Sequence, residues 1–294
     1  MSGTTYTLDA NIGFIGAGSM SGAIIRGLAE LRIADPKRIF AINKTNAARL
    51  DELAGKFGIR TPRTEEERSR FIREADMIVL GMKPKDAANA IASFRHLLRP
   101  GQLIVSVIAG LSIATIRQLI GADLPIVRTM PNIASTVGMG ATGLSFSPEV
   151  SEAQREEAVK LFRSIGHVNV VEERLLDIVT GVSGSGPAYV YYLMEAMIAA
   201  GVAEGLSEQA ARELTVETVL GAAHLAKMTD EKPDELRRKV TSPNGTTQAA
   251  IEWMEARGVS EAVSGAVRRA AERSRELGEA IAKDALSQGK EVQP

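Results

Sequence analysis

A glycine-rich segment near the start of the chain has the residue types and the spacing of a dinucleotide-binding turn. Residues 12–22 read IGFIGAGSMSG, so that a short apolar run leads through the turn into a helical pattern. In such turns the first glycine permits a tight bend, the second lets the backbone approach a pyrophosphate, and the helix N-terminus offers free N–H groups. Gly16 and Gly18 hold these positions, and Ser21 stands where the third glycine or alanine is usual. The segment predicts a nucleotide site.

The end of the second apolar run indicates which dinucleotide is bound. An NAD site usually has a carboxylate there that binds the ribose 2′-hydroxyl. This chain instead reads Asn43-Lys44-Thr45, a cation between two small polar side chains that could bind a 2′-phosphate. We therefore expect NADPH as the cofactor, with NADH as the alternative. The competing interpretation of Lys44 is an ordinary surface lysine.

Two further segments close predicted strands and so belong to the sheet edge at which open α/β sheets bind ligands. They are Met82-Lys83-Pro84 and Ile108-Ala109-Gly110. Small or conformationally restricted residues suit a backbone that runs beside a cofactor. Lys83 could equally be a loop lysine.

Three polar loops lie outside this nucleotide pattern. They span residues 128–132 (RTMPN), 183–187 (SGSGP) and 242–247 (SPNGTT). The second and third precede helical patterns, where amides and hydroxyls can bind a small anion such as a carboxylate. We therefore predict substrate-binding roles for Ser185 and Gly186 and for the loop Ser242 to Thr247. The alternative for either loop is simple helix capping by Ser and Thr.

The elements that must position these residues change in character along the chain. Short apolar runs alternate with helical patterns up to about residue 172, which is typical of parallel βαβ units, and helices alone follow. The expected strands span residues 12–15, 38–42, 77–82, 103–108, 126–130, 141–147 and 167–171. The expected helices span residues 19–31, 45–57, 85–98, 112–120, 151–165, 188–203, 207–228, a short piece after Pro233, and 260–286.

This pattern predicts an α/β fold in which an N-terminal doubly wound parallel sheet of Rossmann type, residues 1–172, precedes an all-helical domain, residues 173–294. The last helix carries a stripe at alternating spacings of four and three, typical of a packing seam between helices. Its members are Val263, Val267, Ala270, Ser274, Leu277 and Ile281. The stripe could pack within the monomer or form a subunit interface.

Composition excludes several classes of function. The formal charge is −1, with 35 Lys and Arg against 36 Asp and Glu, so general nucleic-acid binding is not expected. The absence of cysteine excludes disulfides and thiolate metal sites. No metal site is expected from the 3 scattered histidines. The chain has neither a secretion signal nor an apolar stretch of membrane-spanning length, which predicts a cytoplasmic protein.

Hydrolase and phosphate-loop signatures are also missing from the sequence. We find no G-x-S-x-G, no G-x-x-x-x-G-K-[ST] and no H-E-x-x-H. Hydride transfer remains, a reaction in which the cofactor supplies the difficult chemistry and the protein supplies orientation.

Taken together, the loops resemble those of pyrroline-5-carboxylate reductase, the last enzyme of proline biosynthesis. The matching segments run over nearly the whole chain: IGFIGAGSM, VLGMKPK, SVIAGLSI, RTMPNIASTVGMG, VSGSGPAYVYYLMEAM and VTSPNGTTQAAIE. The last three are the most specific. The resemblance implies a dinucleotide-binding domain, a helical domain that forms intertwined homodimers, and in many members rings of dimers.

The resemblance also implies roles for individual residues. Ser242, Pro243, Asn244, Gly245, Thr246 and Thr247 would hold the carboxylate and ring of the substrate, with Thr247 placed to hydrogen-bond the ring nitrogen during catalysis. The cofactor would contact Ile15, Gly16, Ala17, Gly18, Ser19, Met20, Asn43, Lys44, Thr45, Gly81, Met82, Lys83, Pro84, Ile108, Ala109 and Gly110, and would lie near Glu173.

Three positions depart from the family's usual pattern. Asn244 replaces the first glycine of a common SPGG loop, Ser19 stands where asparagine is frequent, and Arg68 stands where many members have an asparagine. The first departure bears on loop stiffness and the last on how the adenosine end is held.

The expected reaction is hydride transfer from NADPH to the imine carbon of L-1-pyrroline-5-carboxylate, which gives L-proline. The expected partners are the small cyclic imine carboxylate and a second copy of the chain, in a homodimer or a ring of dimers, and neither nucleic acid nor a membrane is expected. One alternative is a different imine or hydroxyacid reductase of the same architecture. A hydroxyacid dehydrogenase would need a proton-donating lysine early in the helical domain, and Gly181 to Gly205 contains none. The other alternative is a non-catalytic paralogue that binds the nucleotide.

Overall fold

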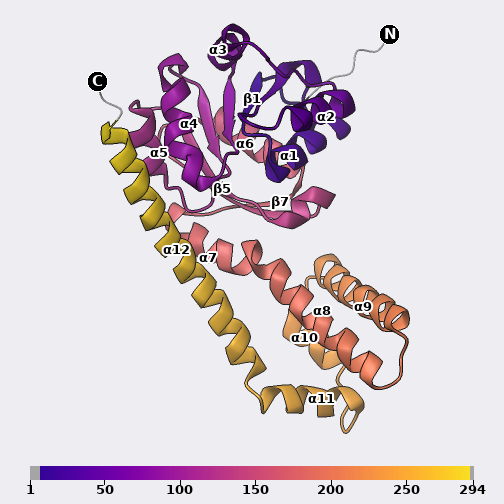
Figure 1. The fold of residues 1–294 in the computed structure, drawn as a ribbon. Helices are drawn as coiled ribbons and strands as arrows, with labels where there is room; N and C mark the ends of the chain where they lie inside the picture. The colour runs from indigo at the N-terminus through magenta and orange to yellow at the C-terminus, as the bar shows by residue number, and fades with distance from the viewer. Residues whose placement is uncertain (1–6, 292–294) are drawn as a thin grey trace. The chain divides into compact units, whose positions relative to one another are not determined.

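The computed structural model describes residues 7–291, which form two compact units (Figure 1). The first unit comprises the described residues up to Gly184 together with those from Ala270 onward, and the second comprises Ser185–Arg269. The chain therefore leaves the first unit and returns to it. The domain boundary that the sequence predicts after residue 172 remains a prediction. The boundary between the two compact units falls after Gly184, because the helix Leu176–Val179 packs on two strands of the sheet and so belongs to the first unit.

A seven-stranded sheet forms the centre of the first unit, in the order β2-β1-β3-β4-β5-β6-β7. Its first five strands run parallel, β6 is antiparallel to β5, and β7 is parallel to β6. The strands are β1 (Ile12–Ile15), β2 (Ile39–Ile42), β3 (Met77–Leu80), β4 (Leu103–Ser106), β5 (Ile126–Met130), β6 (Gly140–Phe146) and β7 (Gly166–Val170). The predicted parallel α/β sheet is confirmed.

Helices cover both faces of this sheet, which explains why its strands read as continuous apolar runs. Alternate strand residues point to opposite faces: Ile12 and Phe14 join one buried cluster, and Ile15 joins the other. The first cluster includes residues of α1 (Ser19–Glu30), α2 (Ala47–Phe57) and α6 (Glu152–Arg163). The second includes residues of α3 (Glu65–Glu74), α4 (Ala87–Phe94) and α5 (Ile113–Ile120).

Short helical turns complete the first unit. The 3-10 turns are Pro36–Arg38, Pro84–Asp86, Arg95–Leu97, Ile133–Val137 and Glu173–Leu175. The chain then continues through α7 (Leu176–Val179) into a π-helical turn, Thr180–Gly184.

Helix α3 is an element that the sequence analysis did not anticipate. Its sequence EEERSRFIRE buries only Phe71 and Ile72, which is too little apolar periodicity to reveal a helix. Its start is fixed by a capping box, in which the Thr64 side chain accepts from the Glu67 backbone and the Glu67 carboxylate accepts from the Thr64 backbone. Local hydrogen bonding therefore begins this helix.

A buried glutamine fixes the other end of α3. The Gln102 side chain donates to the carbonyl oxygens of Ile72, at 2.8 Å, and Ala75, at 2.7 Å, and accepts from the backbone N–H of Arg99 at 2.7 Å. The residue is only 2% exposed, so these three hydrogen bonds are shielded from water. Gln102 thereby ties the end of α3 to the chain that enters β4.

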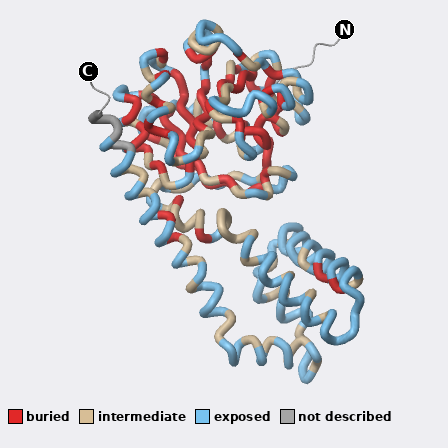
Figure 2. The backbone as a smooth tube through the Cα atoms, viewed as in Figure 1, coloured by how far each residue is buried: buried red, intermediate tan, exposed pale blue. Residues whose placement is uncertain are grey.

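The second unit is helical and has almost no core of its own. Among Ser185–Arg269 only Ala211 and Thr215 are buried, and Figure 2 shows this unit mostly exposed. Its helices are α8 (Gly186–Ala203), α9 (Glu208–Met228), α10 (Pro233–Lys239), α11 (Thr246–Glu255) and the first part of α12 (Val259–Glu291). Among the described residues, no helix has the length and apolar character needed to cross a membrane.

We predict that Gln102→Ala lowers the free energy of unfolding by about 2–3 kcal/mol, because it removes the three hydrogen bonds of a buried side chain. The matched control is Gln118→Ala, which removes an exposed glutamine from α5 and should stay within about 0.5 kcal/mol of the wild type. Urea denaturation of both variants checks this. Equal stabilities would contradict the role assigned to Gln102.

Candidate functional site

The sheet brings four of the predicted cofactor segments to one edge. Strands β2, β1, β3 and β4 are neighbours and parallel, so their carboxyl ends lie side by side. Each predicted segment directly follows one of these ends: Gly16 to Met20 after β1, Asn43 to Thr45 after β2, Gly81 to Pro84 after β3, and Ile108 to Gly110 close after β4. Parallel pairing thus gathers residues that are far apart in the sequence.

The turn after β1 has the tight geometry that the glycine pattern predicts. Gly16 has φ +100°, and a Cβ atom there would lie 2.6 Å from the carbonyl carbon of Gly81. The backbone N–H of Gly81 donates to the Ile15 carbonyl at 2.9 Å. No residue larger than glycine fits at position 16, because both its φ and its distance from the β3 loop forbid a side chain.

Ser21 explains how the chain tolerates a departure from the usual fingerprint. Its side chain is 1% exposed, and its hydroxyl donates to the Gly16 carbonyl oxygen at 2.6 Å. The same hydroxyl packs where a side chain at Gly81 would stand. The serine therefore closes the turn with a hydrogen bond that glycine or alanine could not make.

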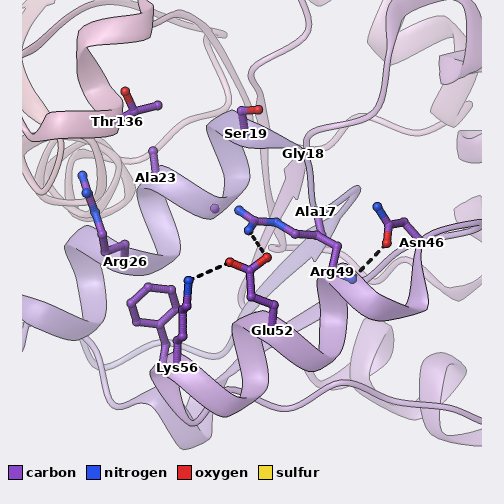
Figure 3. Close-up of a pocket in the computed structure, with 12 residues that line it drawn as sticks. Ala17, Gly18, Ser19, Ala23, Arg26, Asn46, Arg49, Glu52, Lys56 and Thr136 are labelled. Carbon is purple, nitrogen blue, oxygen red and sulfur yellow. Dashed lines mark hydrogen bonds and ion pairs between the residues drawn. The ribbon is translucent and has the colours of Figure 1, made fainter.

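The N-terminus of α1 faces an open cavity of about 490 Å³ (Figure 3). Gly18 is the N-cap, so no side chain satisfies the first N–H groups, and the first turn contains no acidic residue. These amides and the positive end of the helix dipole suit an anion such as a pyrophosphate. Among the predicted residues, Ala17, Gly18 and Ser19 line this cavity.

Helix α2 supplies charged residues to the same cavity that the sequence analysis missed. Figure 3 shows Arg49 and Lys56 on either side of Glu52, with Arg49 Nη1 at 2.5 Å and Lys56 Nζ at 2.9 Å from its carboxylate oxygens. These hydrogen bonds, Lys56 first, lower the pKa of Glu52. The Arg49 guanidinium lies over Gly22 of α1, where a side chain would collide with it.

The signal for Arg49 was present but unspecific. Arg49 lies in the first turn of the helix that follows the second strand, where its side chain could reach either solvent or the nucleotide. Asn46, also on the cavity wall, caps α2 by accepting from the Arg49 backbone N–H at 2.9 Å. Lys44, the predicted phosphate ligand, is exposed in the loop before this cap. The cavity wall formed by Arg26, Arg49, Lys56 and Glu52 is net positive, so it fits a nucleotide phosphate.

Glu173 belongs to a largely buried ion network beside α5. Its Oε1 atom accepts from the backbone N–H of Ile113 at 2.8 Å and lies 3.1 Å from Arg128 Nη1. Arg128 Nη2 lies 3.8 Å from Asp177 Oδ1, and the Arg128 side chain is 10% exposed. Glu173 thus holds the first residue of α5, close after the predicted cofactor segment Ile108 to Gly110.

The loop Ser242 to Thr247 lies in the second unit and leads into α11. Asn244 has φ +57°, a left-handed conformation that asparagine adopts more readily than most other non-glycine residues. This explains how Asn244 can replace the usual glycine. Its N–H donates to Gln248 Oε1 at 2.8 Å, and Gly245 caps α11 from an extended conformation.

The start of α11 can receive an anion. Its N-cap has no side-chain hydrogen bond, and its first turn, which begins with Thr246 and Thr247, has no acidic residue. The Thr247 side chain is half-buried. The N–H groups of this turn therefore remain available to a carboxylate.

The loop of residues 183–187 does not form the helix start with free N–H groups that the sequence predicts. Ser185 has helical backbone angles and follows the π-helical turn directly, so the chain is nearly continuously helical from Leu176 into α8. The expected free helix N-terminus at Ser185 and Gly186 is therefore wrong, because the preceding turn continues the helix. The first predicted loop contacts this turn: Asn132 Nδ2 donates to the Ser183 carbonyl at 3.0 Å.

Ser19 and Arg68, the other two departures from the family pattern, lie on different helices of the first unit. Ser19 is the first residue of α1 and lies on the cavity wall. Arg68 lies on α3, where its guanidinium is 3.7 Å from Glu65.

Comparisons with known proteins agree on one family. Residues 11–110 match the family described as NADP oxidoreductase, coenzyme F420-dependent, and residues 173–277 match the family described as pyrroline-5-carboxylate reductase dimerisation. The chain is 40% identical over 274 residues to pyrroline-5-carboxylate reductase 1 of Bacillus subtilis, covering 93% of this chain and 91% of that protein. It is 37% identical to the enzyme of Methanosarcina acetivorans, covering 92% and 98%.

Solved structures agree with these sequence matches. A pyrroline-5-carboxylate reductase from Coxiella burnetii superposes with a TM-score of 0.86 at 35% identity, covering 91% of this chain and 98% of that one. The Plasmodium falciparum pyrroline carboxylate reductase, solved with NADP bound, has a TM-score of 0.81 at 27% identity, covering 93% and 100%. Because similarity of this level extends over both compact units, the chain belongs to the pyrroline-5-carboxylate reductase family.

Proposed function

We propose that this protein reduces L-1-pyrroline-5-carboxylate to L-proline with a hydride from NADPH, the final step of proline biosynthesis. One observation carries the proposal: the chain combines a dinucleotide cradle in the first unit with an anion-receptive α11 N-terminus in the second. Full-length relatives that bear the name of this reductase have matching regions for both. The protein is an NAD(P)H-dependent oxidoreductase.

The first unit would bind the cofactor. The α1 amides would contact the pyrophosphate, and the segments after β2, β3 and β4 would line the remaining length of the dinucleotide. Lys44, with Asn43 and Thr45, would contact the ribose 2′-phosphate. When bound, the cofactor supplies the hydride that is added to the imine carbon.

The second unit would bind the substrate. The N–H groups at the start of α11 would hold the carboxylate, and the Thr247 hydroxyl would hydrogen-bond the ring nitrogen. Ser185, Gly186 and the remaining residues from Ser242 to Thr246 would shape the ring site. Hydride addition converts the C=N bond to a C–N bond, and the nitrogen keeps the proton of its iminium form.

This chemistry requires little acid–base catalysis from the protein. A protonated imine is already electrophilic, so positioning and exclusion of water supply most of the rate enhancement. The residues proposed for the site accordingly include no histidine.

We further propose that the functional protein is a cytoplasmic homodimer, which can assemble into rings of dimers. The second unit buries too little apolar surface to be stable alone, and α8 exposes Tyr191, Tyr192 and Leu193. A second copy of the same unit would cover these side chains.

The direct test is the consumption of NADPH, followed by its absorbance, with pyrroline-5-carboxylate and with a panel of other cyclic imines, hydroxyacids and ketoacids. Turnover of pyrroline-5-carboxylate with formation of proline supports the proposal. Faster turnover of another substrate would assign a different reductase, and nucleotide binding without turnover of any of them would assign a non-catalytic role.

Thr247→Val should lower kcat/KM for the imine by the equivalent of about 1–3 kcal/mol, because the side chain keeps its shape and loses its hydroxyl. Thr247→Ser keeps the hydroxyl and should retain most of the activity. Steady-state kinetics at saturating NADPH measures both. Wild-type activity in the valine variant would remove Thr247 from the mechanism.

Lys44→Ala should raise KM for NADPH about tenfold and leave KM for NADH nearly unchanged, because only NADPH carries the 2′-phosphate. The ratio of the two KM values, compared with that of the wild type, is the measurement. The control is Lys37→Ala, which removes a lysine from the 3-10 turn that precedes β2 and so lies at the opposite edge of the sheet. An unchanged ratio in Lys44→Ala would show that Lys44 is an ordinary surface lysine.

For the assembly, light scattering should give at least twice the chain mass of 31.4 kDa. Leu193→Glu, in α8, should shift the protein towards monomer because a carboxylate would be buried without a partner. Leu31→Glu, at a 61% exposed leucine of the first unit, should leave the mass unchanged. A monomeric wild-type protein at micromolar concentration would contradict the proposed dimer.

A further inference from the structure

The C-terminal half of α12 packs on the first unit through a narrow face. Ala271 and Ser274 are buried, and Gly278 and Ile281 are half-buried, so that the face recurs every three or four residues. Leu277, a member of the stripe predicted from the sequence, is 44% exposed and lies outside this face. The described part of this half therefore packs within the monomer, which was one of the two alternatives for the stripe.

At the centre of this face two backbones touch. A Cβ atom on Gly278 would lie 2.7 Å from the carbonyl oxygen of Gly110, and a Cβ atom on Gly110 would lie 3.2 Å from Gly278 Cα. Gly110 also has φ +78°. This approach is open only to a pair of glycines, so α12 sits directly on the loop that follows β4.

Contacts on either side hold the helix in this position. One turn earlier, the Ser274 hydroxyl donates to Asp177 Oδ1 at 2.7 Å. One turn later, Ile281 packs against the buried cluster on the α3, α4 and α5 face of the sheet. The Gly110 contact is thus fixed from both directions along the helix.

A series of contacts connects Ser274 to the residues that follow the loop Ile108 to Gly110. Asp177 pairs with Arg128, Arg128 pairs with Glu173, and Glu173 accepts from the N–H of Ile113. The side chains of Arg128 and Asp177 are 10% and 14% exposed, so water screens the ion pair between them poorly. The loop is therefore held by α12 at its last residue, Gly110, and by the ion network three residues further along the chain, at Ile113.

We propose that the C-terminal half of α12 pre-forms the cofactor loop, and that Gly278 and Ser274 are positioning residues for NADPH. This inference rests on the proposed function, which places Ile108 to Gly110 beside the cofactor. A loop already held in its binding conformation need not be ordered when the ligand binds, which strengthens binding. Neither residue is assigned to contact the cofactor.

Gly278→Ala tests the proposal, because its methyl group must displace the Gly110 carbonyl or the helix. Calorimetric titration of the variant with NADPH should give a Kd about tenfold above that of the wild type. Gly55→Ala is the matched control: it adds the same methyl group to a helix at a position where a Cβ meets nothing within 4 Å, and its Kd should not change.

Ser274→Ala provides a second, milder variant. It removes the hydrogen bond to Asp177 without adding atoms, and its Kd for NADPH should rise about threefold. Ser287→Ala, which alters an exposed serine of the same helix, is its control. If Gly278→Ala does not fold, Ser274→Ala decides the question.

Thermal unfolding without ligand separates positioning from simple stability. A lower Tm for Gly278→Ala and Ser274→Ala with a wild-type Kd would overturn the proposal and leave α12 a purely structural support. The titrations do not depend on turnover, so an inactive wild-type protein that binds NADPH would refute the proposed reaction while the Kd ratios still test this inference.

Discussion

Parallel pairing of β1 with both β2 and β3 is the constraint on which the rest of the first unit depends. Ile15 at the end of β1 is in register with Ile42 of β2 and Leu80 of β3, so the three strands end together. Every segment that follows these strands must then leave the sheet at the same edge. The nucleotide cradle is a direct consequence, because its parts come from separate strand-to-helix turns.

The crowding at this edge accounts for residues that otherwise look arbitrary. The Gly16 backbone lies against Gly81, and the Ser21 hydroxyl lies beside both. This hydroxyl donates a hydrogen bond to the Gly16 carbonyl, at a position where a smaller residue is usual. Helix α2 places the Arg49 guanidinium over Gly22 of α1, and Glu52 of the same helix forms an ion pair with it. The cavity is therefore bounded by a rigid backbone on one side and by paired charges on the other.

The two compact units differ in how much of their apolar surface they bury. In the first, helices on both faces of the sheet bury long apolar runs. In the second, most apolar side chains of α8 and α9 remain exposed, so the unit depends on surfaces that it does not contain. Helix α12 belongs to both units, and its second half is anchored to the first unit through glycine contact and the Ser274 hydrogen bond.

The sequence by itself determined the strand pattern, the glycine turn and the change to helices, because these follow from local periodicity and from the conformations that glycine permits. It also identified the family from loops such as RTMPN and SPNGTT. It missed α3, which is started by a capping box and ended by distant Gln102, and it wrongly made Ser185 a free helix start.

Only the tertiary structure decided which face of α12 packs on the first unit, that Arg49 reaches the cavity, and that Gly110 meets Gly278. These features are contacts between residues far apart in the chain, and no local pattern encodes such contacts.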